Sequence, residues 1–270
     1  MYGQFDEVRI IKKIYEEYNL PKTCIEFGAY DGITNSNTYY FWNKKGFRSL
    51  LIEPDTNLYK LLQKNSNQNC TVINDFVSVK NPLDKLIKKY NFPNKIGILS
   101  IDIDSNDLEI FKKIDHSSTF IVIIEFNNQF PVWVDYEDPS DCIIFRHSAL
   151  AVINFAKTKG YKLLDVKGSN LILINGENLS LPDTLYPNSL EDCFDYEQQK
   201  KTCKDIRIIG SKFTTNAKVF SQKPNILLRL KKYLFQLIVV INYSLRGKPV
   251  PSNKITRDCK KKILNAGLYL

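Results

Sequence analysis

Two patterns of apolar residues alternate along the first 176 residues of this chain. The first is a helical spacing, in which apolar side chains recur every three or four positions, as Val8, Ile11 and Ile14 do. The second is a short unbroken apolar run, which is typical of a strand buried on both faces. We expect seven strands, at 23–28, 48–53, 70–74, 96–101, 120–126, 161–166 and 170–174. We expect helices at 5–18, 56–64, 82–90, 108–114 and 148–159.

This alternation predicts the fold class. Apolar strands separated by helices form a parallel sheet with helices on both faces. Only Lys167, Gly168 and Ser169 separate the last two expected strands, which is too short for a parallel crossover and favours a hairpin. The sequence therefore predicts a doubly wound α/β domain over 1–176, with a mostly parallel seven-stranded sheet and a late antiparallel hairpin.

The pattern changes after residue 176. Prolines and mixed polar residues predict an irregular connecting segment over 177–225. Within 226–245 the apolar residues share one helical stripe, and Arg229, Lys231 and Lys232 lie near its start. We therefore expect a basic, partly amphipathic helical extension over 226–270. Such a helix can contact a membrane surface, dock on the domain or form a homodimer seam.

The charge divides at the same place. The formal net charge of +9 is the sum of −6 over residues 1–199 (21 basic, 27 acidic) and +15 over residues 200–270 (17 basic, 2 acidic). The basic end suits an anionic partner such as membrane headgroups, nucleic acid or an acidic substrate, or it is a solvated surface. Because the domain itself is acidic, nucleic acid is not the partner that we favour.

Targeting signals are not evident. No unbroken apolar run reaches eighteen residues, and the first residues do not form a signal peptide. The six cysteines include no C-x-x-C pair, so a structural zinc site would lack its usual spacing. Because no signal peptide is evident, we expect reduced thiols and a cytoplasmic location, with the inner face of the membrane as an alternative.

A turn rich in small residues, Glu26-Phe-Gly-Ala-Tyr-Asp-Gly32, follows the first expected strand. Doubly wound sheets bind ligands at the carboxyl ends of their strands, and glycine permits positive φ or a close backbone approach. A phosphate-binding loop would carry bare amides and a lysine, whereas this turn carries Glu26 and Asp31. It favours a ligand with hydroxyls or a cationic group, and a tight structural turn is the alternative.

Two further acids end the next strands. Glu53 ends the second expected strand, where a carboxylate can accept both hydroxyls of a ribose. The alternative is a charge that stabilises the following helix N-terminus. Asp75 follows the third expected strand and is a candidate for contact with an adenine amino group.

Acidic and amide side chains follow the fourth and fifth expected strands: Asp102, Asp104, Asp107, Glu125 and Asn127. Neighbouring parallel strands bring these side chains to one edge, where like charges must be protonated, hydrogen-bonded or bound to a cation. Oxygen ligands suit Mg²⁺ or another divalent cation, for which Asp104, Glu125 and Asn127 are the candidate ligands. The alternatives are helix capping by Asp107 and a catalytic role for Asp104 or Glu125.

His147 precedes the last expected helix of the domain. Its ordinary pKa makes it a candidate general base, and a surface or capping histidine is the alternative. The neighbouring Arg146 is a candidate for holding an anionic group of a substrate.

Together these motifs resemble S-adenosylmethionine-dependent methyltransferases of the Rossmann-like class and, among them, the FkbM-type family. The segments that carry the resemblance are Glu26–Gly32, Ile52-Glu53-Pro54, Leu99–Asp107, Ile124–Asn127 and Ala156–Leu163, and it spans roughly 20–176.

The resemblance implies roles for these residues. The methionine part of S-adenosylmethionine would lie among Glu26, Gly28, Ala29 and Gly32. Glu53 would hold the ribose, Asp75 and Phe76 would flank the adenine, and Asp102 and Asp104 would lie near the methyl group. Metal-dependent relatives hold Mg²⁺ at these strand ends, but Glu125 and Asn127 replace their usual Asp-Asp or Asp-Asn pair here.

The implied activity is O-methylation of a sugar, a surface-glycan precursor or a related small-molecule hydroxyl. Asp104, His147, Glu125 or a metal-bound hydroxyl would assist proton removal. The alternatives are a nucleic-acid-binding protein or methyltransferase that uses the basic end, and a noncatalytic Rossmann-like binding module.

Overall fold

The computed structural model describes residues 3–103, 107–130, 132–137 and 146–204 of the 270-residue chain. Its strands are β1 (Thr23–Phe27), β2 (Arg48–Ile52), β3 (Cys70–Ile73), β4 (Ile96–Ile101), β5 (Thr119–Glu125), β6 (Tyr161–Lys167) and β7 (Asn170–Asn175). Its α-helices are α1 (Glu7–Glu17), α2 (Tyr39–Lys44), α3 (Thr56–Asn65), α4 (Leu83–Lys89), α5 (Asp107–Phe111), α6 (Ala149–Lys157), α7 (Leu190–Cys193) and α8 (Tyr196–Lys204). Two 3-10 turns, at His116–Ser118 and Asp183–Leu185, complete the described elements.

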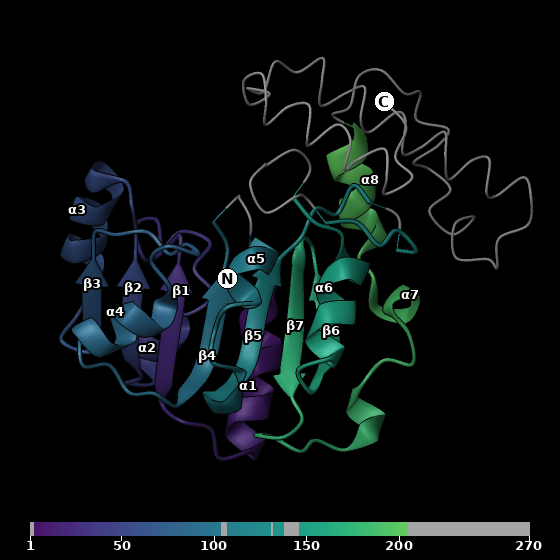
Figure 1. Ribbon diagram of the computed structural model, residues 1–270, viewed down its shortest axis with the longest axis horizontal. Coiled ribbons are helices and arrows are strands. Elements are labelled where there is room, and N and C mark those ends of the chain that lie inside the picture. Colours follow the sequence, from purple (N-terminus) through teal and green to yellow (C-terminus); the bar gives the residue numbers. More distant parts are fainter. Residues whose placement is uncertain (1–2, 104–106, 131, 138–145, 205–270) are drawn as a thin grey trace, which may run out of the picture.

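The seven strands form one sheet in the order β3-β2-β1-β4-β5-β7-β6 (Figure 1). Strands β1 to β5 are parallel, and β7 runs antiparallel to both β5 and β6. The predicted fold class, including the late hairpin, is confirmed.

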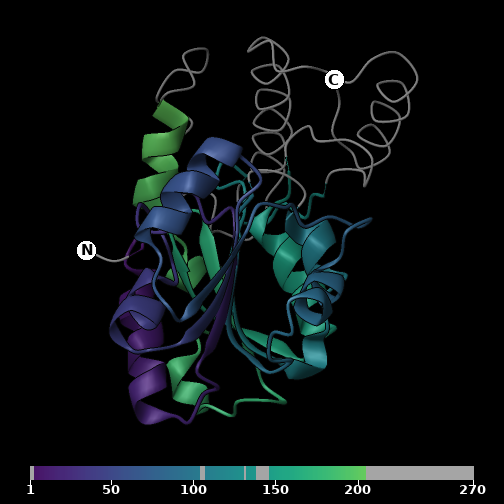
Figure 2. The same ribbon diagram turned by 90° about the vertical axis from the view of Figure 1, so that its left-hand side faces the viewer.

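Helices cover both faces of the sheet, as the edge-on view in Figure 2 shows. Helices α1, α2 and α3 pack on one face, and α4, α5 and α6 pack on the other. Successive strand residues therefore enter different cores: Ile25 and Phe27 face the second group of helices, and Cys24 faces the first. Both faces of each central strand must be apolar, which explains the unbroken runs in the sequence.

The order of the strands creates a switch point between β1 and β4. From β1 the chain proceeds outward through β2 to β3, and from β4 it proceeds in the opposite direction through β5. The loops that leave the carboxyl ends of β1 and β4 therefore diverge, and a crevice forms between them.

Some parts of the chain differ from the prediction. Helix α2 was not expected, and α7 and α8 lie within the segment that was expected to be irregular. Gln199 of α8 donates from Nε2 to the carbonyl oxygens of Asn128 (2.9 Å) and Phe130 (3.0 Å), so this helix is attached to the loop that follows β5. The expected extension over 226–270 lies outside the described residues.

No helix in the described part of the chain combines the length and the apolar character that crossing a bilayer requires.

Asp55 is the N-cap of helix α3, and its Oδ1 accepts hydrogen bonds from the backbone N–H groups of Asn57 and Leu58. We expect Asp55→Ala to lower the free energy of unfolding by about 1 kcal/mol, because two amides of the first turn lose their acceptor. Asp55→Asn keeps an acceptor oxygen and should cost much less. Urea unfolding of the two variants checks this, and equal losses would contradict the capping role.

Candidate functional site

A cavity of about 520 Å³ lies at the switch point of the sheet. Its walls come from the ends of β1 and β5 and from the segments that follow β1, β2 and β4, together with Gln4 near the N-terminus. A crevice outside the carboxyl ends of the strands is where doubly wound proteins bind ligands, and this volume suits a ligand of nucleoside size or larger.

Gly28 lies where the loops after β1 and β4 come close together. Its φ is +67°, and a Cβ at this position would lie 2.0 Å from the carbonyl oxygen of Asp102. A side chain at residue 28 would therefore force the two loops apart. Gly28, Ala29 and Asp102, which were predicted to bind a cofactor, all line the cavity, and their role toward a cofactor stays a prediction.

The loop after β1 contains unusual backbone conformations. Tyr30 (φ +53°) and Asn35 (φ +58°) are left-handed without being glycine, and both line the cavity. Such conformations cost free energy and gather at binding sites, where the surrounding structure holds them in place.

Glu26 organises this loop from the end of β1. Its carboxylate accepts hydrogen bonds from the hydroxyls of Ser36 and Thr38 (2.6 Å each) and from the backbone N–H of Asn37 (2.8 Å). Burial nevertheless raises the pKa of Glu26, and these three hydrogen bonds oppose the shift. Glu26 lines the cavity, and it also fixes the position of residues 36–38.

Glu53 occupies the corresponding place after β2 and is only 5% exposed. Oε2 accepts from the backbone N–H of Tyr30 (2.9 Å), and Oε1 accepts from that of Asp55 (2.8 Å). Each oxygen keeps a lone pair, so the carboxylate can still accept two hydroxyl groups of a ligand in the cavity.

The charge of the lining residues is one-sided. No described residue of the lining is lysine or arginine. Four of them carry a carboxyl group: Glu26, Glu53, Asp102 and Glu125. Such a wall repels phosphate groups and favours a ligand that carries positive charge or hydroxyl donors.

Glu125, at the end of β5, forms an ion pair with Arg146. Asn127 is buried, and its Oδ1 accepts from the backbone N–H of Gln129 (3.0 Å), so this oxygen stabilises a turn. Within the described residues there is no group of three or more His, Cys, Asp or Glu side chains arranged to hold a metal ion. The predicted ligand set also includes Asp104, which lies outside the described residues, so the metal role of Glu125 and Asn127 stays a prediction.

Two other acids were predicted at this edge of the sheet, Asp104 and Asp107, and the structure describes only the second. Asp104, predicted as a catalytic residue and a metal ligand, lies outside the described residues. Asp107 is fully buried, and its Oδ1 accepts from the backbone N–H of Ile103 (2.8 Å). It holds the end of β4 beside the cavity.

His147 lies in the interior and does not line the cavity. Its Nε2 donates to the carbonyl oxygen of Glu125 at 2.7 Å, and burial lowers the pKa of the imidazole to about 4. A general base must reach its substrate, so this placement argues against the predicted catalytic role. His147 instead fixes the backbone that carries Glu125.

The burial of His147 predicts a pH dependence. Because the folded pKa is about 4 and the ordinary value is 6.5, the folded state binds fewer protons. The contribution of His147 to the free energy of unfolding is therefore present at pH values above 6.5 and is lost as the pH falls toward 4. The loss is about 2 kcal/mol between pH 7 and pH 5.

His147→Gln keeps an N–H donor but does not titrate. The free energy of unfolding of the wild type should therefore fall by about 2 kcal/mol relative to that of the variant when the pH is lowered from 7 to 5. Burial also lowers the pKa of His116 to about 4, but His116 is present in both proteins and cancels. A difference that does not change with pH would contradict this account.

Three predicted cofactor-binding residues do not line the cavity: Gly32, Asp75 and Phe76. A Cβ on Gly32 would lie 2.6 Å from Cδ1 of Leu62, so this glycine permits packing against α3. Asp75 Oδ1 accepts from the side-chain amide of Asn81 (3.1 Å), and Phe76 is 58% exposed. In this structure both belong to an outer loop.

Sequence reasoning missed several lining residues, among them Gln4, Asn35 and Asn37. Asn37 is 2% exposed, and its Nδ2 donates to Oγ of Ser100 (3.1 Å). Its Oδ1 is buried and has no hydrogen-bond partner among the described residues. An acceptor without a donor in a cavity wall fits a ligand that supplies an N–H or O–H group.

The fold and the site together define a doubly wound α/β protein with an acidic ligand cavity at its switch point. No protein-family model matches the sequence, and no curated protein matches it.

Solved structures similar to this chain include a SAM-dependent methyltransferase from Aquifex aeolicus, at 13% identity and a TM-score of 0.40, over 63% of this chain and 92% of that one. A protein of the NADB-Rossmann superfamily from Streptococcus agalactiae has 10% identity and a TM-score of 0.41, over 88% and 99%. The glycopeptide N-methyltransferase MtfA with bound S-adenosylhomocysteine has 7% identity and a TM-score of 0.37, over 64% and 90%.

Proposed function

We propose that this protein is an S-adenosylmethionine-dependent methyltransferase. The observation that carries the proposal is the composition of the cavity wall at the switch point. Among the described residues of this wall, four carry a carboxyl group and none is a lysine or an arginine. S-adenosylmethionine is a nucleoside with a sulfonium and an ammonium group and no phosphate, so its charge suits this wall. A dinucleotide, whose pyrophosphate needs N–H donors and cations, does not suit it.

Different residues along the cavity would bind different parts of the cofactor. Glu53 would accept the ribose hydroxyls, since both of its oxygens keep a lone pair beside the cavity. The loops held by Glu26 and Gly28 would enclose the methionine part, and Asn37 Oδ1 would accept from a donor group of the ligand. When bound, S-adenosylmethionine supplies an activated methyl group for in-line displacement.

The remaining task of the protein is to align an acceptor and to receive its proton. Ile103 lines the cavity, and Asp104 follows it in the chain. We propose Asp104 as the group that receives this proton, because the carboxylate of Glu125 pairs with Arg146 and His147 is buried away from the cavity.

We further propose that the acceptor is a hydroxyl of a sugar, a surface-glycan precursor or a related small molecule. The support for this is the resemblance of residues 26–32, 52–54, 99–107 and 124–127 to the FkbM-type family. Contact of residues 226–270 with a membrane surface, or homodimerisation through them, remains part of this proposal and would suit a lipid-linked acceptor.

Calorimetry with S-adenosylhomocysteine tests the cofactor. We expect binding in the micromolar range, and folded protein that does not bind would contradict the proposal. A methyl-transfer screen against surface-glycan precursors, with and without EDTA, tests the acceptor and any need for metal. Cofactor binding together with in-cell function that survives replacement of Asp104 and Glu125 would favour a noncatalytic binding module.

A further inference from the structure

The segment Gly3–Glu7, which we call the N-terminal segment, is attached to strand β7 by the buried carboxylate of Glu7. Glu7 is fully buried. Its Oε2 accepts from the backbone N–H of Phe5 (2.8 Å), and its Oε1 accepts from Nδ2 of Asn170 at the start of β7 (2.7 Å). Asn170 is paired with Glu125 in the β5–β7 ladder. Glu7 therefore ties the N-terminal segment to the strands that end beside the cavity.

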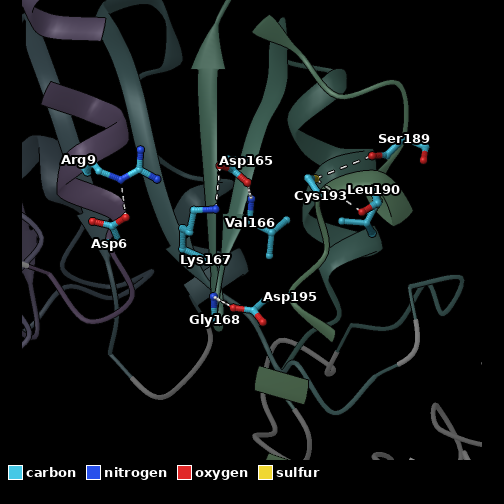
Figure 3. A network of polar contacts seen from close by, with 10 residues as sticks. All are labelled: Asp6, Arg9, Asp165, Val166, Lys167, Gly168, Ser189, Leu190, Cys193 and Asp195. Carbon is cyan, nitrogen blue, oxygen red and sulfur yellow. Dashed lines mark hydrogen bonds and ion pairs between the residues drawn. The ribbon is translucent and has the colours of Figure 1, made fainter. Parts of the chain in front are cut away.

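The turn between β6 and β7 provides a second attachment. Phe5 packs against Gly168 so closely that a Cβ on this glycine would lie 2.2 Å from the Phe5 ring. Asp195, which precedes α8, accepts from the backbone N–H of Gly168 at 3.2 Å (Figure 3). The hairpin turn is thus held by the N-terminal segment and by the residue that leads into α8.

These attachments place the start of the N-terminal segment at the cavity wall. A Cβ on Gly3 would lie 3.5 Å from Oδ1 of Asn37, the buried acceptor that has no partner among the described residues. The next residue, Gln4, is exposed at the surface and also lines the cavity, so it lies at the mouth.

The position of Gln4 relative to Glu53 decides which part of a ligand it can reach. Glu53 follows β2, whereas the N-terminal segment is attached to β7, and β1, β4 and β5 lie between these two strands in the sheet. If Glu53 holds the ribose of a nucleoside, the group attached to the 5′ carbon of that ribose can therefore extend across the cavity toward Gln4. In S-adenosylmethionine this group is the amino-acid part, with an ammonium group and a carboxylate.

The carboxylate of such a ligand needs uncharged N–H donors, because the described wall contains four carboxyl groups and no lysine or arginine. The amide of Asn37 already donates to Ser100. The side-chain amide of Gln4 has no hydrogen bond to another described residue and carries two donors. Resting on the proposed function, we propose that Gln4 donates to the carboxylate of the bound cofactor and that the N-terminal segment exists to place it there.

The experiment compares two probes on the full chain by calorimetry. S-adenosylhomocysteine carries the amino-acid end, and 5′-methylthioadenosine shares its adenosine and sulfur but lacks that end. Gln4→Glu adds a carboxylate and should weaken S-adenosylhomocysteine binding about tenfold or more, and Gln4→Ala roughly fivefold. Neither variant should change the affinity for 5′-methylthioadenosine by more than about twofold.

Gln63→Glu is the matched control, because Gln63 is an exposed glutamine of α3 that donates to Tyr59 (2.8 Å) and does not line the cavity. It should leave both affinities unchanged. Equal losses for the two probes in the Gln4 variants, or no loss for either, would overturn the role of Gln4 while leaving the proposed function intact. Wild-type protein that binds neither probe would overturn the proposed function and this inference with it.

Discussion

Replacement of Gly28 by alanine is expected to abolish measurable binding of S-adenosylhomocysteine and to lower the free energy of unfolding by about 3 kcal/mol. The left-handed φ of +67° accounts for about 1–2 kcal/mol of this loss, because a Cβ is unfavourable there. The clash with the carbonyl oxygen of Asp102, 2.0 Å from the Cβ, accounts for the rest. Both loops line the cavity, so separating them changes the shape of the binding site.

Gly46→Ala is a closely matched control. Gly46 has a φ of +69°, but no atom lies within 4 Å of a Cβ built there. This variant should lose only about 1–2 kcal/mol from the backbone conformation and should bind S-adenosylhomocysteine like the wild type. Urea unfolding and calorimetry on both variants check the pair. If Gly28→Ala and Gly46→Ala behave alike, the close approach of the two loops does not matter for binding.

Glu53→Gln is expected to weaken binding of S-adenosylhomocysteine by roughly 100-fold. The amide keeps one acceptor oxygen, so it loses the negative charge and one of the two positions at which a ribose hydroxyl can donate. Binding of 5′-methylthioadenosine should fall by the same factor, because it contains the same ribose. Calorimetry with both probes therefore separates Glu53 from Gln4, whose replacement should affect S-adenosylhomocysteine alone.

Asp31→Ala controls for damage to the loop. Asp31 Oδ1 accepts from the backbone N–H groups of Ile33 (2.9 Å) and Thr34 (2.7 Å), so its replacement also disturbs backbone hydrogen bonds after β1. Asp31 does not line the cavity. We expect a stability loss with little change in affinity for either probe. A loss of affinity as large as that of Glu53→Gln would mean that loop order, and not the carboxylate of Glu53, controls binding.

The sheet could be predicted from the sequence because burial on both faces leaves a local signal. Every residue of β4 (Ile96–Ile101) is buried, so the strand appears as an unbroken apolar run. The hairpin was evident for a similar reason, since only two residues separate β6 from β7. These signals depend on neighbouring residues alone and need no knowledge of tertiary contacts.

The missed helices lack such a signal. Helix α2 has six residues, and four aromatic residues in succession hide any helical period. It is stabilised by the complete burial of Phe41 and Trp42 against the sheet. Helix α8 is mostly polar, and Gln199 attaches it to carbonyl groups about 70 residues earlier in the chain. Such contacts arise only when the chain has folded.

The candidate site was predictable only where it follows the strand ends. Glu26 lies at the end of β1, and Gly28, Glu53 and Asp102 each follow a strand directly, so the topology places them at the cavity. His147 could not be judged from its residue type, because its burial depends on how the loop before α6 folds back. Gln4 belongs to no motif, and only the contacts of Glu7 and Phe5 bring it to the mouth.

The hydrogen bond between Glu7 and Asn170 has a kinetic consequence. The two residues are 163 positions apart in the chain, so forming this contact closes a very long loop. Contacts of such high sequence separation slow folding, and this one needs the β6–β7 hairpin to be in place. On refolding, we therefore expect the strand core to form before the N-terminal segment docks. The last, roughly fivefold part of the affinity for S-adenosylhomocysteine should return only in the slowest phase, as a marker of complete folding.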